Sequence, residues 1–155
     1  MDNAVTEDAV SLGIQLACSG GLVLLMSIIH SLGLVGITKA LHLSSTRLMR
    51  ETVNPHSILM IGLLGLLIFL IHIIEILIFA LFYLATGTVN DFEAALFYSA
   101  SAYSTLGLTT NVPAQWHLVG ALEGLVGFVL IGWSTAFMAT TMSRLSETRE
   151  PKLRE

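Results

Sequence analysis

Charge and cysteine are both scarce in this sequence. Only 12% of its residues are charged and 54% are hydrophobic, and its mean hydropathy is +0.80. This balance lies outside the range of soluble domains and indicates an integral membrane protein in contact with a lipid bilayer. The single cysteine, Cys18, excludes an intramolecular disulfide framework and a cysteine metal cluster. The net charge of −4 argues against nucleic acid as a partner.

Positive charge is missing from the N-terminus. The first ten residues contain Asp2, Glu7 and Asp8 but no Lys or Arg, so they lack the basic region of a secretory signal peptide. We therefore expect the first apolar run to be retained. Three runs have the length that crosses a bilayer, and they cover residues 12–37, 57–86 and 118–142. The expected fold class is an all-α membrane protein with three transmembrane helices.

The basic residues predict the topology of these spans. All of them either precede the second span or follow the third: Lys39, Arg47, Arg50, Arg144, Arg149, Lys152 and Arg154. By the positive-inside rule this side of the membrane is the cytoplasm. The N-terminus is then expected outside and the C-terminus in the cytoplasm.

The segment 91–110 has an unusual length for its hydrophobicity. It is too short to cross a bilayer and too apolar for an ordinary loop, which favours a re-entrant segment between the second and third spans. Asn90 or Asp91 can cap a helix, with Glu93 completing a capping-box-like arrangement after Asn90.

We expect this short helix to run from Phe92 to about Tyr103 and to bury Phe92, Leu96, Phe97 and Tyr103. Its C-terminal carbonyls are expected to be unsatisfied and to attract a cation.

A run of residues after this helix can present backbone carbonyls and hydroxyls along a narrow path, as a cation filter does. The run consists of Ser104, Thr105, Leu106, Gly107, Leu108 and Thr109. A buried hairpin between helices is the alternative interpretation. Tyr103 or Ser104 can supply polar contacts behind the run.

Ionisable residues inside a bilayer are costly and are usually paired or functional. His72 and Glu75 lie three residues apart on one helix face, so each can satisfy the other or a neighbouring helix. This placement favours a structural hydrogen-bond pair over a gating or proton-sensing role. Glu123 is predicted to support the filter. Gly127 and Gly132 are expected to be packing sites, although a glycine in a pore-lining helix can also act as a hinge during gating.

His30, in the first span, is expected to be a packing histidine. Shared haem ligation by His30 and His72 is disfavoured because counting 1.5 Å per residue from the span ends places them about 10–15 Å apart in depth.

Several stretches together resemble the pore module of small prokaryotic potassium channels. They are Ala95-Leu-Phe-Tyr-Ser99 before the run, Ser104-Thr105-Leu106-Gly107 within it, His72-Ile-Ile-Glu75 and Ala80-Leu-Phe-Tyr83 in the second span, and Leu122-Glu123-Gly124 and Leu130-Ile-Gly-Trp-Ser-Thr-Ala-Phe137 in the third. The resemblance implies a homotetrameric channel of the prokaryotic inner (plasma) membrane that passes potassium or sodium ions. It implies no enzyme activity and no cofactor.

On this resemblance the chain comprises an N-terminal transmembrane helix with a cytoplasmic connection (1–56), a pore module (57–142) and a cytoplasmic tail (143–155). The family filter has the pattern Thr-Val/Leu-Gly-Tyr-Gly-Asp, whereas Thr105-Leu106-Gly107 continues here as Leu108-Thr109-Thr110. The resemblance therefore implies monovalent cation sites at Thr105, Leu106 and Gly107, with the outer sites altered.

Three other functions are compatible with this pattern: a non-selective pore, a non-conducting channel homologue, and a membrane scaffold or sensory subunit. A membrane enzyme is disfavoured because no nucleophile-base pair or metal-ligand spacing appears at one membrane depth.

Overall fold

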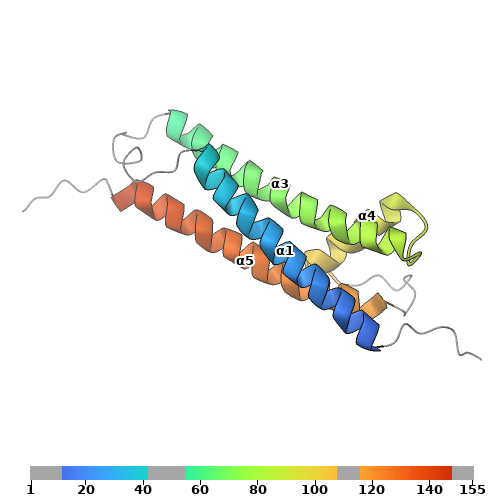
Figure 1. Cartoon of the computed structure of the whole chain (residues 1–155). Helices are drawn as coiled ribbons and strands as arrows, with labels where there is room; N and C mark the ends of the chain where they lie inside the picture. Colours follow the sequence, from blue (N-terminus) through green and yellow to red (C-terminus); the bar gives the residue numbers. More distant parts are fainter. Residues whose placement is uncertain (1–11, 42–54, 108–115, 148–155) are drawn as a thin grey trace, which may run out of the picture. The chain divides into compact units, whose positions relative to one another are not determined.

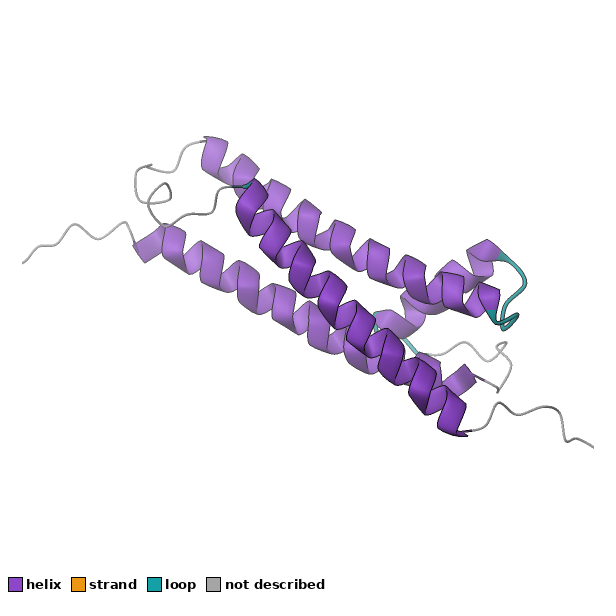
Figure 2. Cartoon of the chain, in the orientation of Figure 1, coloured by secondary structure: helices purple, strands orange, loops and turns teal. Residues whose placement is uncertain are grey.

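The computed structural model describes residues 12–41, 55–107 and 116–147. Within these ranges the regular elements are helices, as Figures 1 and 2 show. They are α1 (Leu12–Ala40), α3 (Pro55–Ala85), α4 (Phe92–Tyr103) and α5 (His117–Glu147). The helices α1, α3 and α5 are long and apolar enough to cross a membrane. The all-helical fold with three membrane-spanning candidates is thus confirmed.

The long helices exceed the predicted spans at several ends, because helical structure continues where hydrophobicity falls. The helix α1 continues to Ala40 and α5 to Glu147. The helix α3 ends near Gly87, as predicted, where Gly87 adopts a φ of 67°. The N–H of Gly87 donates to the Leu84 carbonyl (3.1 Å) and that of Thr88 to the Tyr83 carbonyl (3.0 Å). This pattern is a Schellman cap, in which glycine takes the left-handed position without steric cost.

The described chain forms two compact units, and each long helix contributes a part to both. Of the described residues, the first unit comprises 12–28, 74–107 and 116–129, and the second comprises 29–41, 55–73 and 130–147. The second unit has an aliphatic core made of Leu34, Ile37, Leu64, Ile68 and Ile71, against which Leu41, Leu67, Phe137 and Met138 pack. Because these residues come from α1, α3 and α5, this core joins the three helices within the unit.

The first unit contains α4, whose start and end match the prediction. Asp91 is its N-cap, and the Asp91 side chain accepts a hydrogen bond from the Ala94 N–H at 2.9 Å. Asn90 is therefore not the cap. Glu93 lies in the first turn, where its negative charge interacts favourably with the helix dipole. A capping box counted from Asn90 is wrong by one residue.

The face by which α4 packs differs from the prediction. Ala95, Tyr98, Ser99, Ala102 and Tyr103 are buried, whereas Phe92 and Phe97 are 48% and 63% exposed. The prediction that Phe92 and Phe97 are buried is wrong. The buried face of α4 consists of tyrosines, serines and alanines. Polar contacts to α3 and α5, described below, hold this face in place.

Candidate functional site

The end of α4 is closed by a second Schellman cap. The N–H of Thr105 donates to the Ala102 carbonyl (2.9 Å), and that of Leu106 donates to the Ser101 carbonyl (3.0 Å). The Ser104 N–H and hydroxyl both reach the Ala100 carbonyl. The prediction of unsatisfied carbonyls is therefore wrong for residues 100–102, because the chain folds back on the last turn of the helix.

The left-handed position of this cap is occupied by threonine instead of glycine. Thr105 has a φ of 60°, and Gly107 follows with a φ of 113°. A β-branched residue is a genuine outlier in this region because its side chain crowds the backbone. Strain of this kind persists only where the surrounding structure imposes it, and it is frequent at functional sites.

The segment 104–107 lies at the surface of the chain, and Leu106 is 84% exposed. An open pocket of about 420 Å³ adjoins it, lined by Thr105, Gly107, Gly124, Leu125 and Phe128 among others. The backbone of the segment 104–107 and the apolar side chains of Leu125 and Phe128 therefore line one open pocket in the first unit. Leu108 and Thr109, the last two residues of the predicted filter run 104–109, lie outside the described residues.

Glu123 is the centre of a buried polar network in the first unit. Its side chain is 0% exposed. The Tyr83 hydroxyl of α3 donates to Glu123 Oε2 at 2.6 Å, and the Ser99 hydroxyl of α4 lies 2.5 Å from Glu123 Oε1. Glu123 therefore connects α3, α4 and α5, while its support of a filter stays a prediction.

Ser99 has two acceptors for one hydroxyl proton, because it also lies 2.9 Å from the carbonyl oxygen of Ile76. One arrangement satisfies every group: Glu123 carries a proton and donates to Ser99, while Ser99 donates to Ile76. The neutral carboxyl also avoids the cost of a buried charge. This arrangement fixes α4 to α3 and α5 without an ion pair.

Tyr103, the last residue of α4, makes a second polar connection to α3. Its hydroxyl donates to Glu75 Oε2 at 2.5 Å, and both side chains are buried. Tyr98 differs, since its buried hydroxyl has no hydrogen-bond partner within the described chain. The Tyr98 ring instead packs edge-on against Tyr83, with centroids 4.8 Å apart. Tyr103 therefore positions the start of the segment 104–107 through a side chain of α3.

Two glycines of α5 allow the close approach of α4. A Cβ added at Gly124 would lie 3.0 Å from the Ala102 carbonyl oxygen, and one added at Gly127 would collide with the Tyr103 carbonyl oxygen. A Cβ at Gly132 would meet none of the described atoms within 4 Å. Gly127 is therefore a packing glycine, as expected, whereas Gly132 has no packing role among the residues described.

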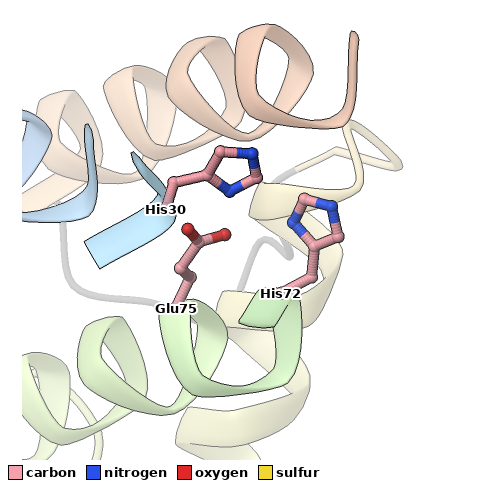
Figure 3. Close-up of side chains that lie close together, drawn as sticks. All are labelled: His30, His72 and Glu75. Atoms are coloured by element: carbon pink, nitrogen blue, oxygen red, sulfur yellow. The ribbon is translucent and has the colours of Figure 1, made fainter. Parts of the chain in front are cut away.

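The second unit contains another polar cluster, in which one serine joins two histidines. Ser134 Oγ lies 3.1 Å from His72 Nε2 and 3.2 Å from His30 Nε2. The two imidazole centroids are 5.3 Å apart, and Figure 3 shows the rings side by side. Figure 3 also labels Glu75, which follows His72 by three residues on α3.

The depth difference of about 10–15 Å predicted for His30 and His72 is therefore wrong. Counting from the span ends assumes that both spans begin at one depth, and the ring contact shows that the two helices are staggered. Each member of the α3 pair has a hydrogen-bonding partner on a neighbouring helix. His72 lies against Ser134 of α5, and Glu75 accepts from Tyr103 of α4.

Sequence reasoning missed Tyr83, Ser99 and Ser134 as members of these networks. Each is a polar residue in an apolar segment, and such residues need a partner when they are buried. That requirement marks them as candidates, but their partners lie 23 to 104 residues away in the sequence. In comparisons with known proteins, no family model matches the sequence, and no curated protein or solved structure matches it.

Proposed function

We propose that the protein is a homotetrameric cation channel of the potassium-channel type, embedded in a prokaryotic plasma membrane. The length of α4 supports this proposal. Its twelve residues span about 18 Å, which is less than the ~30 Å hydrocarbon core. The helix lies in the sequence between two helices that are long enough to cross. In the proposed channel it enters the membrane from outside and the chain returns to the same side.

The observation that carries the proposal is the exposed segment 104–107 beside an apolar surface. Leu106 is 84% exposed, and the neighbouring Leu125 and Phe128 are 59% and 68% exposed. Irregular backbone at membrane depth is tolerated only where it is covered by protein or lines a water-filled cavity. Four copies around one axis provide both conditions, since each copy covers the apolar surface of its neighbour and the four segments face a central path.

In this channel the cation sites are formed by Thr105, Leu106 and Gly107. Their carbonyls and the Thr105 hydroxyl replace part of the hydration shell of the ion. The C-terminal end of α4 contributes a partial negative charge. Glu123 and Glu75 hold α4 in place through Ser99 and Tyr103. Conduction is passive, and the chain performs no catalysis.

Purified protein in planar bilayers tests the proposal. With potassium on one side and sodium on the other, we expect unitary currents, and their reversal potential measures the selectivity. Thr105→Ala removes the hydroxyl and should lower the conductance, whereas Thr135→Ala is a matched control because it removes an exposed hydroxyl from α5 that bonds only within its own helix in the described contacts. Equal effects of the two substitutions, or no current from any preparation, would contradict the proposal.

One observation favours a second candidate, a non-conducting homologue that acts as a membrane scaffold or sensory subunit. The N–H groups of Thr105 and Leu106 are turned back onto α4 by the cap, and the residues after Gly107 depart from the filter pattern. Chemical cross-linking separates the candidates. Tetramers without current favour the scaffold, and a gain of potassium selectivity in Leu108→Tyr with Thr109→Gly favours the channel.

A further inference from the structure

We propose that His30 and His72 form a binding site for a transition metal ion of the zinc class. Both side chains belong to the second unit, His30 on α1 and His72 on α3. His30 is completely buried, and one nitrogen of each ring lies within 4.8 Å of the other. Neutral imidazole is the commonest protein ligand for such ions. The site is separate from the segment 104–107 and does not depend on ion conduction.

The separation of the two rings fits one shared ion. With zinc–nitrogen bonds of about 2.1 Å, the ion lies about 3.2 Å from each ring centroid. Two imidazoles at the tetrahedral angle then have centroids about 5.2 Å apart. The observed centroids are 5.3 Å apart. The ring positions therefore need little change to bind an ion.

The direction of the nitrogens gives the same result. The Nε2 atoms of both histidines converge on one atom, Ser134 Oγ, at 3.1 and 3.2 Å. An ion on the side of the rings that faces Ser134 can coordinate both Nε2 atoms. The serine side chain then rotates, and its two hydrogen bonds to the histidines are replaced by bonds to the ion. The serine hydroxyl or a water molecule can then complete the coordination.

Zinc sites in proteins often combine protein ligands with a water molecule in an open position. Two histidines with oxygen donors from the Ser134 hydroxyl and from water make a site of this kind. Nitrogen and oxygen donors also make the site unsuited to Cu(I), which selects thiolate and thioether ligands.

Trp133 provides a reporter inside the same unit, because its ring centroid lies 5.7 Å from that of His30. The test uses the full chain with Trp116→Phe, so that Trp133 is the remaining tryptophan, and with any affinity tag removed. Titration with Co²⁺ is followed by tryptophan quenching and by the visible absorption of four-coordinate cobalt. Zinc is then added to displace the cobalt.

We expect one Co²⁺ per chain, displaced by zinc. His30→Gln and His72→Gln should each weaken cobalt binding at least about 100-fold. Loss of a group that hydrogen-bonds to a metal ligand lowers metal affinity about 10–100-fold, and loss of the ligand itself costs more. Glutamine is chosen because its amide can still hydrogen-bond with Ser134. His117→Gln is the matched control, since it removes a histidine at the start of α5 outside the site, and it should leave the affinity unchanged.

Three results would overturn the proposal. They are the absence of a four-coordinate cobalt spectrum in the parent protein, unchanged affinity in both His30→Gln and His72→Gln, and loss of binding in His117→Gln. Circular dichroism checks that each variant is helical. If a glutamine variant does not fold, the cobalt spectrum of the parent protein still decides the question, because it needs no substitution at the site.

Discussion

Replacement of Gly127 by alanine is the most direct test of how α5 holds α4. The added Cβ would lie 2.9 Å from Tyr103 Cγ and 3.0 Å from its carbonyl carbon, and would collide with the carbonyl oxygen. Ordinary contact between such carbon atoms needs about 3.5–4.0 Å. Because two of the obstructing atoms belong to the backbone, a side-chain rotation cannot relieve the contact. The end of α4 has to move away from α5.

The size of the effect follows from two opposing contributions. Overpacking costs about 3 kcal/mol at the upper end of the usual range, which applies here because backbone atoms obstruct. Alanine gains about 1 kcal/mol over glycine as a helix former. Gly127→Ala should therefore lower the free energy of unfolding by about 2 kcal/mol.

Two other glycines of α5 provide graded controls. At Gly124 the added Cβ would be 3.0 Å from the Ala102 carbonyl oxygen, a contact that a small shift relieves, so we expect almost no net change. At Gly132 it would meet none of the described atoms within 4 Å, and alanine should stabilise the helix by about 1 kcal/mol.

Unfolding in mixed micelles with increasing SDS, followed by far-ultraviolet circular dichroism, measures the order of the three variants. Equal stability of Gly127→Ala and Gly132→Ala would refute the close contact between α4 and α5.

The same assay tests the polar network. Tyr103→Phe removes a buried hydrogen bond to Glu75 and should cost about 1–3 kcal/mol, whereas Tyr98→Phe removes a hydroxyl that has no partner within the described residues and should be neutral or stabilising. Glu123→Gln should cost less than about 1 kcal/mol and Glu123→Ala about 3 kcal/mol, because only the amide preserves contacts to both hydroxyl groups; similar losses in the two variants would contradict the proposed proton arrangement. Thr105→Gly should raise stability by about 1 kcal/mol by removing left-handed strain, while lowering the current in bilayers; a loss of stability would show that the threonine side chain outweighs the strain.

The sequence was sufficient to predict the elements that depend on local patterns. Three apolar runs predicted the long helices, and the short helix begins after Asp91 and ends at Tyr103 as expected. Length, hydrophobicity and capping residues determine these features within one segment. Asn90 and Asp91 were both candidates for the N-cap because both are good capping residues. Asp91 is the cap, and the error was confined to the capping box counted from Asn90.

Features that depend on packing were predicted less well. Phe92 and Phe97 were assigned to the buried face because they are large and apolar, but in a membrane protein an apolar side chain is also stable on the outside. Polar groups determine the inward face of α4, and their partners lie on other helices. The contact of His30 with His72 was missed for a related reason, since the stagger of two spans cannot be obtained from their lengths.

Thr105 is the position where local preference and observed structure disagree most. The cap that ends α3 has glycine in its left-handed position, at Gly87, whereas the equivalent cap of α4 has threonine. The two caps have the same hydrogen-bond pattern, so the backbone alone does not require a threonine. A side chain kept at a strained position is expected where its hydroxyl has a use that glycine cannot supply. In the proposed channel that use is cation coordination, which explains why stability and conduction should respond in opposite directions to Thr105→Gly.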